Sequence, residues 1–424
     1  MSRNRLRRTL LRCRALALVA LAALPLQAQK LAPVSKDTTT VVYDDDGLRI
    51  RSNDGRRQLK IRGFVDFDAR VVMSDTNDAA PNSLSMHRAR IVFDANVNPV
   101  VAFRMAVDVL TVGAAPIVDA FADVTLSPHW WIRVGKQKTP YGLERYTSIS
   151  EHLFPERSIA TALTSSRDGG VLLTGEYGDG RYAGSIGVFN GIPDGAIGDA
   201  DVNDAKDVAL RLAYRPVMLN GGQGLLVGYN GTSGIQRGTS GNSQLPKFLT
   251  LTGLPFFSYL ESAGAIADGL RTRNGLFTDA HVGHWGVTAE WYQNAARVRR
   301  GTSVGDVTTG GWLGGLDYVL SGERSVHGAV SPAQPFDPSK GHWGALQAVA
   351  RAARVTVSSE AFPLYADSTV AARRATELGA GLNWFLSRTT KLHLDFEQTA
   401  FVGGAPTGDR KTEQMGLLRM QVYF

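Results

Sequence analysis

Residues 59–71 read LKIRGFVDFDARV, and the strict alternation in this stretch decides the class of fold. Successive side chains of an extended strand point to opposite faces, so one face here is apolar and the other mostly charged. The first face holds Ile61, Gly63, Val65, Phe67, Ala69 and Val71, and the second holds Arg62, Phe64, Asp66, Asp68 and Arg70. The same period of two returns in residues 88–97, 103–109 and 391–397, and it predicts an all-β chain.

A soluble β-sandwich would show the same alternation as a membrane barrel, so other features must choose between them. Four features of the sequence favour the barrel. The first two are an export leader and short turns, such as 98–99 and 387–389, that alternate with long connections. The other two are tryptophans near predicted strand ends and a terminal phenylalanine. The tryptophans are Trp130, Trp131, Trp285, Trp291, Trp343 and Trp384. The last segment places Leu418, Met420, Val422 and Phe424 on one face, as the outer-membrane assembly signal does.

The number of strands follows from the number of alternating segments. The 424 residues include 46 glycines and 43% hydrophobic residues, a composition that excludes disorder and suits many strands. Candidate strands start near residues 59, 86, 100, 117, 129, 168, 180, 206, 223, 272, 284, 310, 343, 374, 390 and 413. We therefore predict a transmembrane antiparallel β-barrel of about 16 strands, wide enough to hold an aqueous lumen.

The N-terminus has the form of a secretory signal peptide, which we place at residues 1–28. Six arginines precede an apolar run at 15–24 that is too short to span a bilayer. Residues 29–58 are predicted to be a periplasmic N-terminal extension, with a hairpin in 47–63 that turns at 53–55. Residues 59–424 form the barrel domain, and the predicted location is the bacterial outer membrane.

Charge and cysteine content exclude several function classes. Without the leader the chain has 40 basic and 39 acidic residues, a formal charge of +1, so no nucleic-acid partner is expected. The only cysteine, Cys13, lies in the leader, and its surroundings lack the small residues that precede a lipid anchor. The mature chain therefore has no disulfide and no thiolate metal site, and we predict no cofactor.

The stretch 135–168 (GKQKTPYGLERYTSISEHLFPERSIATALTSSRD) breaks the alternation. Such a segment in an all-β chain is either a flexible loop or a functional one. Its basic residues are Lys136, Lys138, Arg145, Arg157 and Arg167. We predict that it folds into the lumen of the barrel and presents these cations to anions. A second long connection, about 232–273, is rich in Gly, Ser and aromatic residues.

The charged face of the strands is rich in arginine. Guanidinium groups bind oxyanions in bidentate fashion and stay charged at any relevant pH. The positions are Arg62, Arg70, Arg88, Arg90, Arg104, Arg133, Arg211 and Arg351. A plainer interpretation also stands, because lumenal arginines often pair with acids, and Asp66, Asp94, Asp108, Asp119 and Asp123 are available.

Motifs for catalysis or metal binding are weak, and the chain is not predicted to be an enzyme. GTSVG at 301–305 fits the nucleophile-elbow pattern, which would make Ser303 a catalytic serine, but no helix is expected after it. His281 and His284 are three apart and face opposite sides of a strand, which disfavours a metal site.

Six motifs give the sequence a resemblance to the phosphate- and pyrophosphate-selective porin family, porins O and P. They are LSMHRARIVF (84–93), GKQKTPYGLER (135–145), FPERS (154–158), GVFNG (187–191), LSGER (320–324) and GAGLNWF (379–385). The order and spacing match from about residue 47 to 424. The resemblance implies a sixteen-stranded trimeric outer-membrane porin with an inward-folded third loop and a ladder of arginines that feeds a narrow cationic zone.

The resemblance also implies roles for single residues. Arg88 matches a ladder arginine, Arg145 a constriction lysine, Arg157 a constriction arginine, and Asp119 the acid that tempers the site. Two further cations at the neck, Arg90 and Lys138, fall where the family places uncharged or acidic groups.

The sequence departs from the family at His87, at Phe64 and in residues 224–232, where basic residues are expected. Three hypotheses result. The first is a porin for small inorganic anions, phosphate or pyrophosphate, embedded as a homotrimer among outer-membrane lipids. The second is a weakly selective general porin or a structural barrel, and the third is a barrel enzyme such as a lipid hydrolase.

Overall fold

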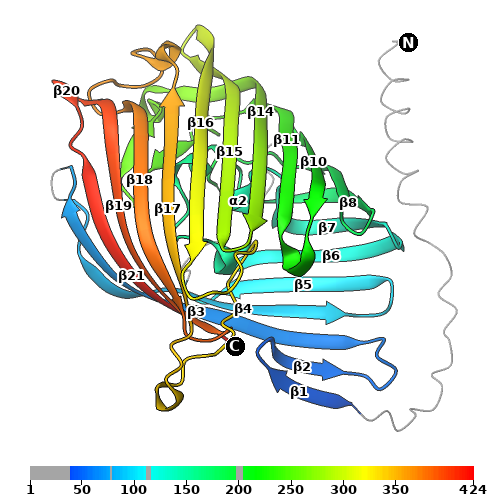
Figure 1. Cartoon of the computed structure of the whole chain (residues 1–424). Helices are drawn as coiled ribbons and strands as arrows, with labels where there is room; N and C mark the ends of the chain where they lie inside the picture. The colour runs from blue at the N-terminus through cyan, green and yellow to red at the C-terminus, as the bar shows by residue number, and fades with distance from the viewer. Residues whose placement is uncertain (1–38, 77–78, 111–115, 197–203) are drawn as a thin grey trace, which may run out of the picture. The chain divides into compact units, whose positions relative to one another are not determined.

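The computed structural model describes residues 39–76, 79–110, 116–196 and 204–424, and among them one antiparallel sheet closes into a barrel (Figure 1). The wall strands are β3 (Gln58–Ser74), β4 (Ser83–Asn96), β5 (Val101–Asp108), β6 (Ile117–Ser127), β7 (Trp130–Lys138), β8 (Arg167–Tyr177), β9 (Tyr182–Phe189), β10 (Asp207–Met218), β11 (Gly224–Arg237), β14 (Ala265–Val282), β15 (Trp285–Arg300), β16 (Ser303–Val319), β17 (Ala345–Val357), β18 (Ala372–Phe385), β19 (Thr390–Ala405) and β21 (Glu413–Tyr423). The prediction of a 16-stranded transmembrane barrel is confirmed. The predicted signal peptide lies outside the described residues.

Smaller elements extend the wall or lie in connections. They are β1 (Thr40–Asp44), β2 (Gly47–Arg51), β20 (Gly408–Asp409), the two-stranded sheet of β12 (Lys247–Leu249) and β13 (Pro255–Ser258), the helix α2 (Leu143–Tyr146), and the 3₁₀ turns η2 (Ile149–Glu151), η3 (Ile159–Leu163), η4 (Asn220–Gly222), η5 (Glu261–Ala263), η6 (Pro338–Lys340) and η7 (Ser359–Ala361). Among the described residues, no helix is both long and apolar enough to cross a membrane.

The first and last wall strands pair and so remove both sheet edges. β21 runs antiparallel to β3, with Leu418 opposite Ala69 and Val422 opposite Val65. The terminal residue completes this seam, because Phe424 N donates to Gly63 O at 3.0 Å and Gly63 N donates to Phe424 O at 2.7 Å. Every wall strand therefore has two hydrogen-bonded neighbours, as a strand in lipid requires.

The polarity of the wall is the reverse of that in a soluble sandwich. In β3, the charged Asp66 and Asp68 are buried, whereas the apolar Phe67 and Val71 are about half exposed. The same reversal runs along β4 to β21, where large aliphatic side chains such as Leu394 face outward. Apolar outer and polar inner faces are the pattern of a barrel surrounded by lipid.

The expected alternation of short turns and long connections fails at two places. β15 and β16 pair up to Arg300 and Ser303, so the connection at the long-loop end is only residues 301–302. At the short-turn end, β16 and β17 are joined by residues 320–344, which we call the 320–344 segment. The nucleophile-elbow motif thus spans a tight turn and the start of β16, without the strand–turn–helix context that a catalytic serine needs.

Two further local predictions can be compared with the structure. The hairpin at 47–63 is confirmed, because Leu48 pairs with Ile61 and Arg51 with Gln58 around the turn at 53–55. The tryptophan prediction holds in part. Trp130 and Trp285 begin β7 and β15, whereas Trp291 lies inside β15, where it pairs with Trp312 of β16.

Two connections fill part of the barrel interior. The third loop, residues 139–166, carries α2, η2 and η3. The loop 238–264 carries β12 and β13, and its Phe248, Phe256 and Phe257 are fully buried in one apolar cluster with the third loop's Ile159 and Leu163. Wall residues of β15 to β19, among them Val298, Val307, Ala353, Val355, Ala375 and Phe401, complete the cluster.

Candidate functional site

Buried carboxylates of the barrel wall hold the third loop inside the lumen. Glu290 of β15 accepts hydrogen bonds from the backbone N–H groups of Leu143 and, at 2.7 Å, Glu144, which begin α2. These N–H groups have no partner within their own helix, so the wall supplies one. Further along, Glu377 of β18 accepts from Ile159 N at 2.8 Å. The predicted inward fold of this loop is therefore confirmed.

The middle of the third loop is fastened to the same side of the barrel. Lys391 Nζ donates to Ser150 O at 2.9 Å, and Asn383 Nδ2 donates to Leu153 O at 2.9 Å. Because these donors belong to β19 and β18, the loop covers the inner face of β14–β19, which we call the packed wall. The inner face of β3–β7, which we call the arginine wall, lies across the remaining space.

A cavity of about 1010 Å³ lies between the arginine wall and the third loop. Its charged lining comprises nine cations and five acids, which gives it a positive balance. The cations are Lys60, Arg62, Arg90, Arg104, Arg133, Lys138, Arg157, Arg167 and Arg388, and the acids are Asp44, Asp45, Asp46, Asp119 and Glu151.

Most arginines of the arginine wall are paired with an acid on an adjacent strand. Arg90 Nη2 lies 3.1 Å from Asp108 Oδ2, and Arg133 Nε lies 2.7 Å from Asp123 Oδ1. Both pairs are direct cross-strand neighbours. The remaining pairs on this wall are Arg88–Asp66, Arg62–Asp94 and Arg104–Asp94, at 2.5–2.9 Å. Arg167, which begins β8, reaches Asp119 of β6 at 2.8 Å. The acids used are the five that the sequence offered, so the paired interpretation holds for these six arginines.

Arg157 differs from these arginines. It makes no hydrogen bond or ion pair with any residue that the structure describes, and its buried Nε has no partner. Burial, with the nearby positive charges of Arg145 and Arg167, lowers the pKa of Arg157 well below its usual range. A cation removed from water without a counter-ion is unstable, so this position favours an anion.

Lys138 lies beside Arg157 in the cavity lining and is held by backbone oxygens. Its Nζ donates to Tyr146 O at 2.8 Å and Thr147 O at 2.7 Å. These two carbonyls orient the ammonium group without neutralising it. Across the β7–β8 hairpin, Lys138 is paired in register with Arg167. This part of the cavity lining therefore holds three cations and one acid, namely Lys138, Arg157, Arg167 and Asp119.

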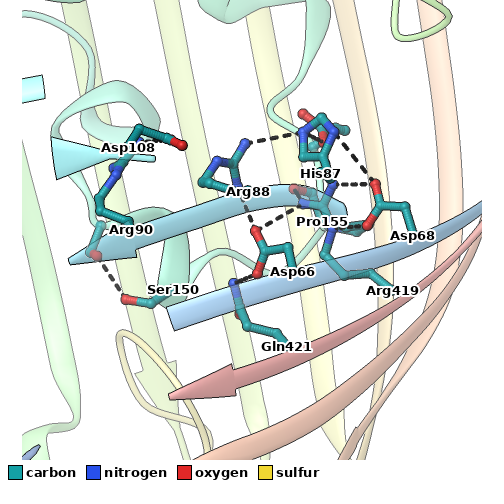
Figure 2. A network of polar contacts seen from close by, with 12 residues as sticks. Asp66, Asp68, His87, Arg88, Arg90, Asp108, Ser150, Pro155, Arg419 and Gln421 are labelled. Carbon is teal, nitrogen blue, oxygen red and sulfur yellow. Dashed lines mark hydrogen bonds and ion pairs between the residues drawn. The ribbon is translucent and has the colours of Figure 1, made fainter. Parts of the chain in front are cut away.

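Four of the six residues predicted for the neck line this cavity: Arg90, Asp119, Lys138 and Arg157. The other two are engaged elsewhere. Arg145 donates to Thr164 Oγ1 and Thr161 O, both at 3.0 Å, within the third loop itself. Burial lowers the Arg145 pKa to about 10. Arg88 donates to Asp66 at 2.8 Å and also contacts His87 (Figure 2).

Figure 2 shows how Arg88 joins a larger network that fixes the third loop. The fully buried Arg419 of β21 lies 2.6 Å from Asp68 and 2.6 Å from Glu156 of the loop. His87 Nε2 lies 3.0 Å from the same Glu156 carboxylate. Burial raises the pKa of Glu156, but the hydrogen bond from His87 and the charge of Arg419 outweigh it and hold the pKa well below its usual range. His87 thus acts in the anchorage of the loop.

Sequence reasoning missed two parts of the lining. Arg167 was noted in the loop but was not assigned to the neck, although the register of the β7–β8 hairpin places it opposite Lys138. Residues 327–331 of the 320–344 segment also reach the cavity, from the end where only short turns were expected. The pairing of β7 with β8 was a usable signal for Arg167, whereas the 320–344 segment has no periodicity that would place it.

Comparisons with solved structures agree with the barrel fold. The chain is similar to the outer membrane channel DcaP of Acinetobacter baumannii, with 11% identity, 88% of this chain and 99% of that chain covered, and a TM-score of 0.57. It is also similar to an anion-selective porin from Comamonas acidovorans (13% identity, 87% and 100% covered, TM-score 0.53). A third similar structure is OmpT of Vibrio cholerae in a trimer form (11% identity, 87% and 100% covered, TM-score 0.53).

At these identities the solved structures show the fold alone, and the family comes from the sequence. Comparison with curated proteins gives no match. The family model described as phosphate-selective porin O and P matches residues 58–424, nearly all of the described barrel. The resemblance drawn from six short motifs is thereby confirmed, and the chain belongs to the phosphate-selective porin O and P family of bacterial outer-membrane channels.

Proposed function

We propose that this porin conducts small inorganic anions, with phosphate or pyrophosphate as preferred solutes, past a neck formed by Arg157, Lys138, Arg167 and Asp119. Arg90 lines the approach, and Arg88 and Arg145 hold the neck in shape. The observation that carries the proposal is the unpaired, partly buried guanidinium of Arg157 at a cavity whose other arginines are mostly neutralised.

The energetics support a site of moderate strength. A unit charge contributes about 4 kcal/mol at 4 Å when the effective dielectric is near 20. Arg157 and Lys138 together can therefore offset part of an anion's dehydration, while Asp119 limits how tightly the anion is held. Conduction needs this balance, because an ion bound too tightly does not leave.

Ion selectivity of the refolded protein tests the proposal. In a planar bilayer with a KCl gradient, we expect a reversal potential of the sign that chloride permeation gives. We also expect added phosphate to reduce the chloride current, because phosphate occupies the neck for longer. Cation preference would rule out the proposed function.

A weakly selective general porin is the second candidate, and the pairing of the arginine wall favours it. Five wall arginines, Arg62, Arg88, Arg90, Arg104 and Arg133, each have a carboxylate partner, which reduces the field along the approach. Chloride current that millimolar phosphate leaves unchanged would favour this candidate over the first.

We extend the proposal to processing and assembly. Residues 1–28 would be removed on export, residues 29–58 would form the periplasmic extension, and the barrel would assemble as a homotrimer in outer-membrane lipid. N-terminal sequencing of the exported protein checks the cleavage after Ala28. Light scattering of the detergent-solubilised protein checks the trimer, and a monomeric mass would contradict it.

A further inference from the structure

A cluster of two histidines and an aspartate lies at the short-turn end of the barrel. Asp279 and His281 are two residues apart on β14, so both side chains face the interior. His327 reaches them from the 320–344 segment. One ligand atom from each of the three residues lies within 4.8 Å of the others.

The distances within the cluster suit a metal ion. His281 Nε2 lies 3.2 Å and His327 Nδ1 lies 2.9 Å from the same atom, Asp279 Oδ2. A tetrahedral zinc ion with bonds near 2.0–2.1 Å places pairs of its ligand atoms about 3.3 Å apart. Two imidazoles and a carboxylate also form a ligand set that zinc, nickel and copper accept.

A second layer of hydrogen bonds orients the three groups. Ser325 Oγ donates to Asp317 Oδ2 at 2.6 Å, so its lone pair is available to accept from His281 Nδ1 at 2.7 Å. This arrangement places a proton on His281 Nδ1, and in the neutral imidazole the Nε2 lone pair then faces Asp279. Thr288 Oγ1 donates to Asp279 Oδ1 at 2.6 Å, which leaves Oδ2 for the cluster. A lone pair and a carboxylate oxygen that face each other need a cation between them.

A second cluster in the described residues consists of Asp68, His87 and Glu156. It does not need an added cation between its ligand atoms. The Arg419 guanidinium already contacts both of its carboxylates, so a cation is present there. The Asp279 cluster has no arginine or lysine within hydrogen-bond distance among the described contacts. It also borders a cavity of about 450 Å³, from which an ion can enter.

We propose that Asp279, His281 and His327 bind a divalent transition-metal ion, which fastens the 320–344 segment to the inner wall of β14. The segment matters for the pore because residues 327–331 line the large cavity and Gly328 lies close to Glu151 of the third loop. Metal binding thus fixes one side of the cavity at the short-turn end. This inference is independent of the anion preference proposed above.

Zinc binding by the refolded full-length porin, without a polyhistidine tag, tests the site. We expect one zinc ion per chain by titration calorimetry, and a loss of affinity of at least about tenfold in His327→Gln and His281→Gln. His327 lies on a half-exposed part of the segment, so its replacement leaves the barrel intact. Ser325→Ala should weaken binding by roughly 10–100-fold, as the loss of an orienting hydrogen bond does.

His342→Gln is the matched control, because it removes an imidazole from the same segment but not from the cluster. It should bind zinc as the wild-type porin does. Equal zinc affinity in wild-type and His327→Gln would overturn the site, and so would the absence of zinc binding by the wild-type porin, which would mean that a proton alone joins the cluster.

Proteolysis tests the fastening of the segment separately. Arg324 and Lys340 are exposed trypsin sites on either side of His327. Zinc should slow cleavage at these sites in the wild-type porin and in His342→Gln, but not in His327→Gln. Cleavage at the same rate with and without zinc would overturn the fastening.

Discussion

Both the arginine wall and the packed wall of this barrel carry inward-pointing arginines, but these are more exposed on the first wall than on the second. On the arginine wall, the side chains of Arg62 and Arg104 share Asp94 and remain 39% and 40% exposed. On the packed wall, Arg351 is 3% exposed and is bound to Glu377 and Glu397. Phe154 of the third loop lies over Arg351, 4.3 Å from its guanidinium carbon to the ring centre.

The difference comes from what covers each wall. The third loop and the loop 238–264 exclude water from the packed wall and turn its arginine into a structural anchor. Most of the arginine wall has no such cover, and Arg62, Arg90, Arg104 and Arg133 line the large cavity. Arg88 is the exception, because it contacts His87 in the network that holds the third loop. We therefore expect an inward-pointing arginine to line the conduction path only where no loop lies over it.

The largest effect is expected from removing the buried arginine. Arg351→Met removes the cation that two buried carboxylates, Glu377 and Glu397, share, which costs about 3–5 kcal/mol. Arg104→Met on the arginine wall breaks an exposed pair and should cost no more than about 1 kcal/mol. Chemical unfolding of the refolded porin, followed by tryptophan fluorescence, measures both. Similar losses of stability in the two variants would contradict the distinction between the walls.

A smaller effect is expected from releasing one anchor of the third loop. Glu290→Ala removes the acceptor of two buried N–H groups, and each unsatisfied donor costs about 1–3 kcal/mol. The loop should then move away from the packed wall and raise the noise and the mean of the single-channel conductance. Asp306→Ala, which removes an exposed acid near a tight turn, is the control. Conductance that is the same in both variants would show that Glu290 does not hold the loop.

The fold could be predicted from the sequence because each wall strand carries its own signal. Alternation marks the strand, and Pro140, Gly142 and Pro155 mark the third loop, where alternation stops. The 320–344 segment was not predictable in this way. Its sequence has no period, and its position is fixed by contacts of Ser325 and His327 with residues 44 and 48 positions away.

The candidate site was predictable only as a set of cations. Which acid neutralises which arginine depends on strand register, and the pairing of β3 with β4 shifts by a residue between Asp66 and Phe67. Arg157 is unpaired because the nearby acids have other partners. Glu144 accepts from Ser158 and Thr161, and Glu156 is bound by Arg419. Such competition between partners is decided in three dimensions.

The next effect concerns selectivity rather than stability. Arg157→Gln removes the unpaired cation, and we expect phosphate block of the chloride current to weaken by about tenfold, which equals 1.4 kcal/mol. The double variant Arg133→Gln/Asp123→Asn removes a neutral pair from the same cavity and should leave the block almost unchanged. Dose–response curves in planar bilayers compare the two. A stronger effect from the double variant would place the site on the arginine wall instead of the loop.

The smallest effect is expected from salt, and it separates the two walls without a mutation. Raising KCl from about 0.1 M to 1 M shortens the screening length from about 10 Å to 3 Å, and exposed charges are screened far more than buried ones. The permeability ratio of chloride to potassium should therefore fall toward one, while the stability difference between wild-type and Arg351→Met should persist. Reversal potentials at a fixed concentration ratio, and unfolding curves at both salt levels, measure the two quantities. The contrary outcome is that salt reduces the permeability ratio and the stability difference in parallel. Water would then reach Arg351 as freely as it reaches Arg104, and the loops would not exclude water from the packed wall.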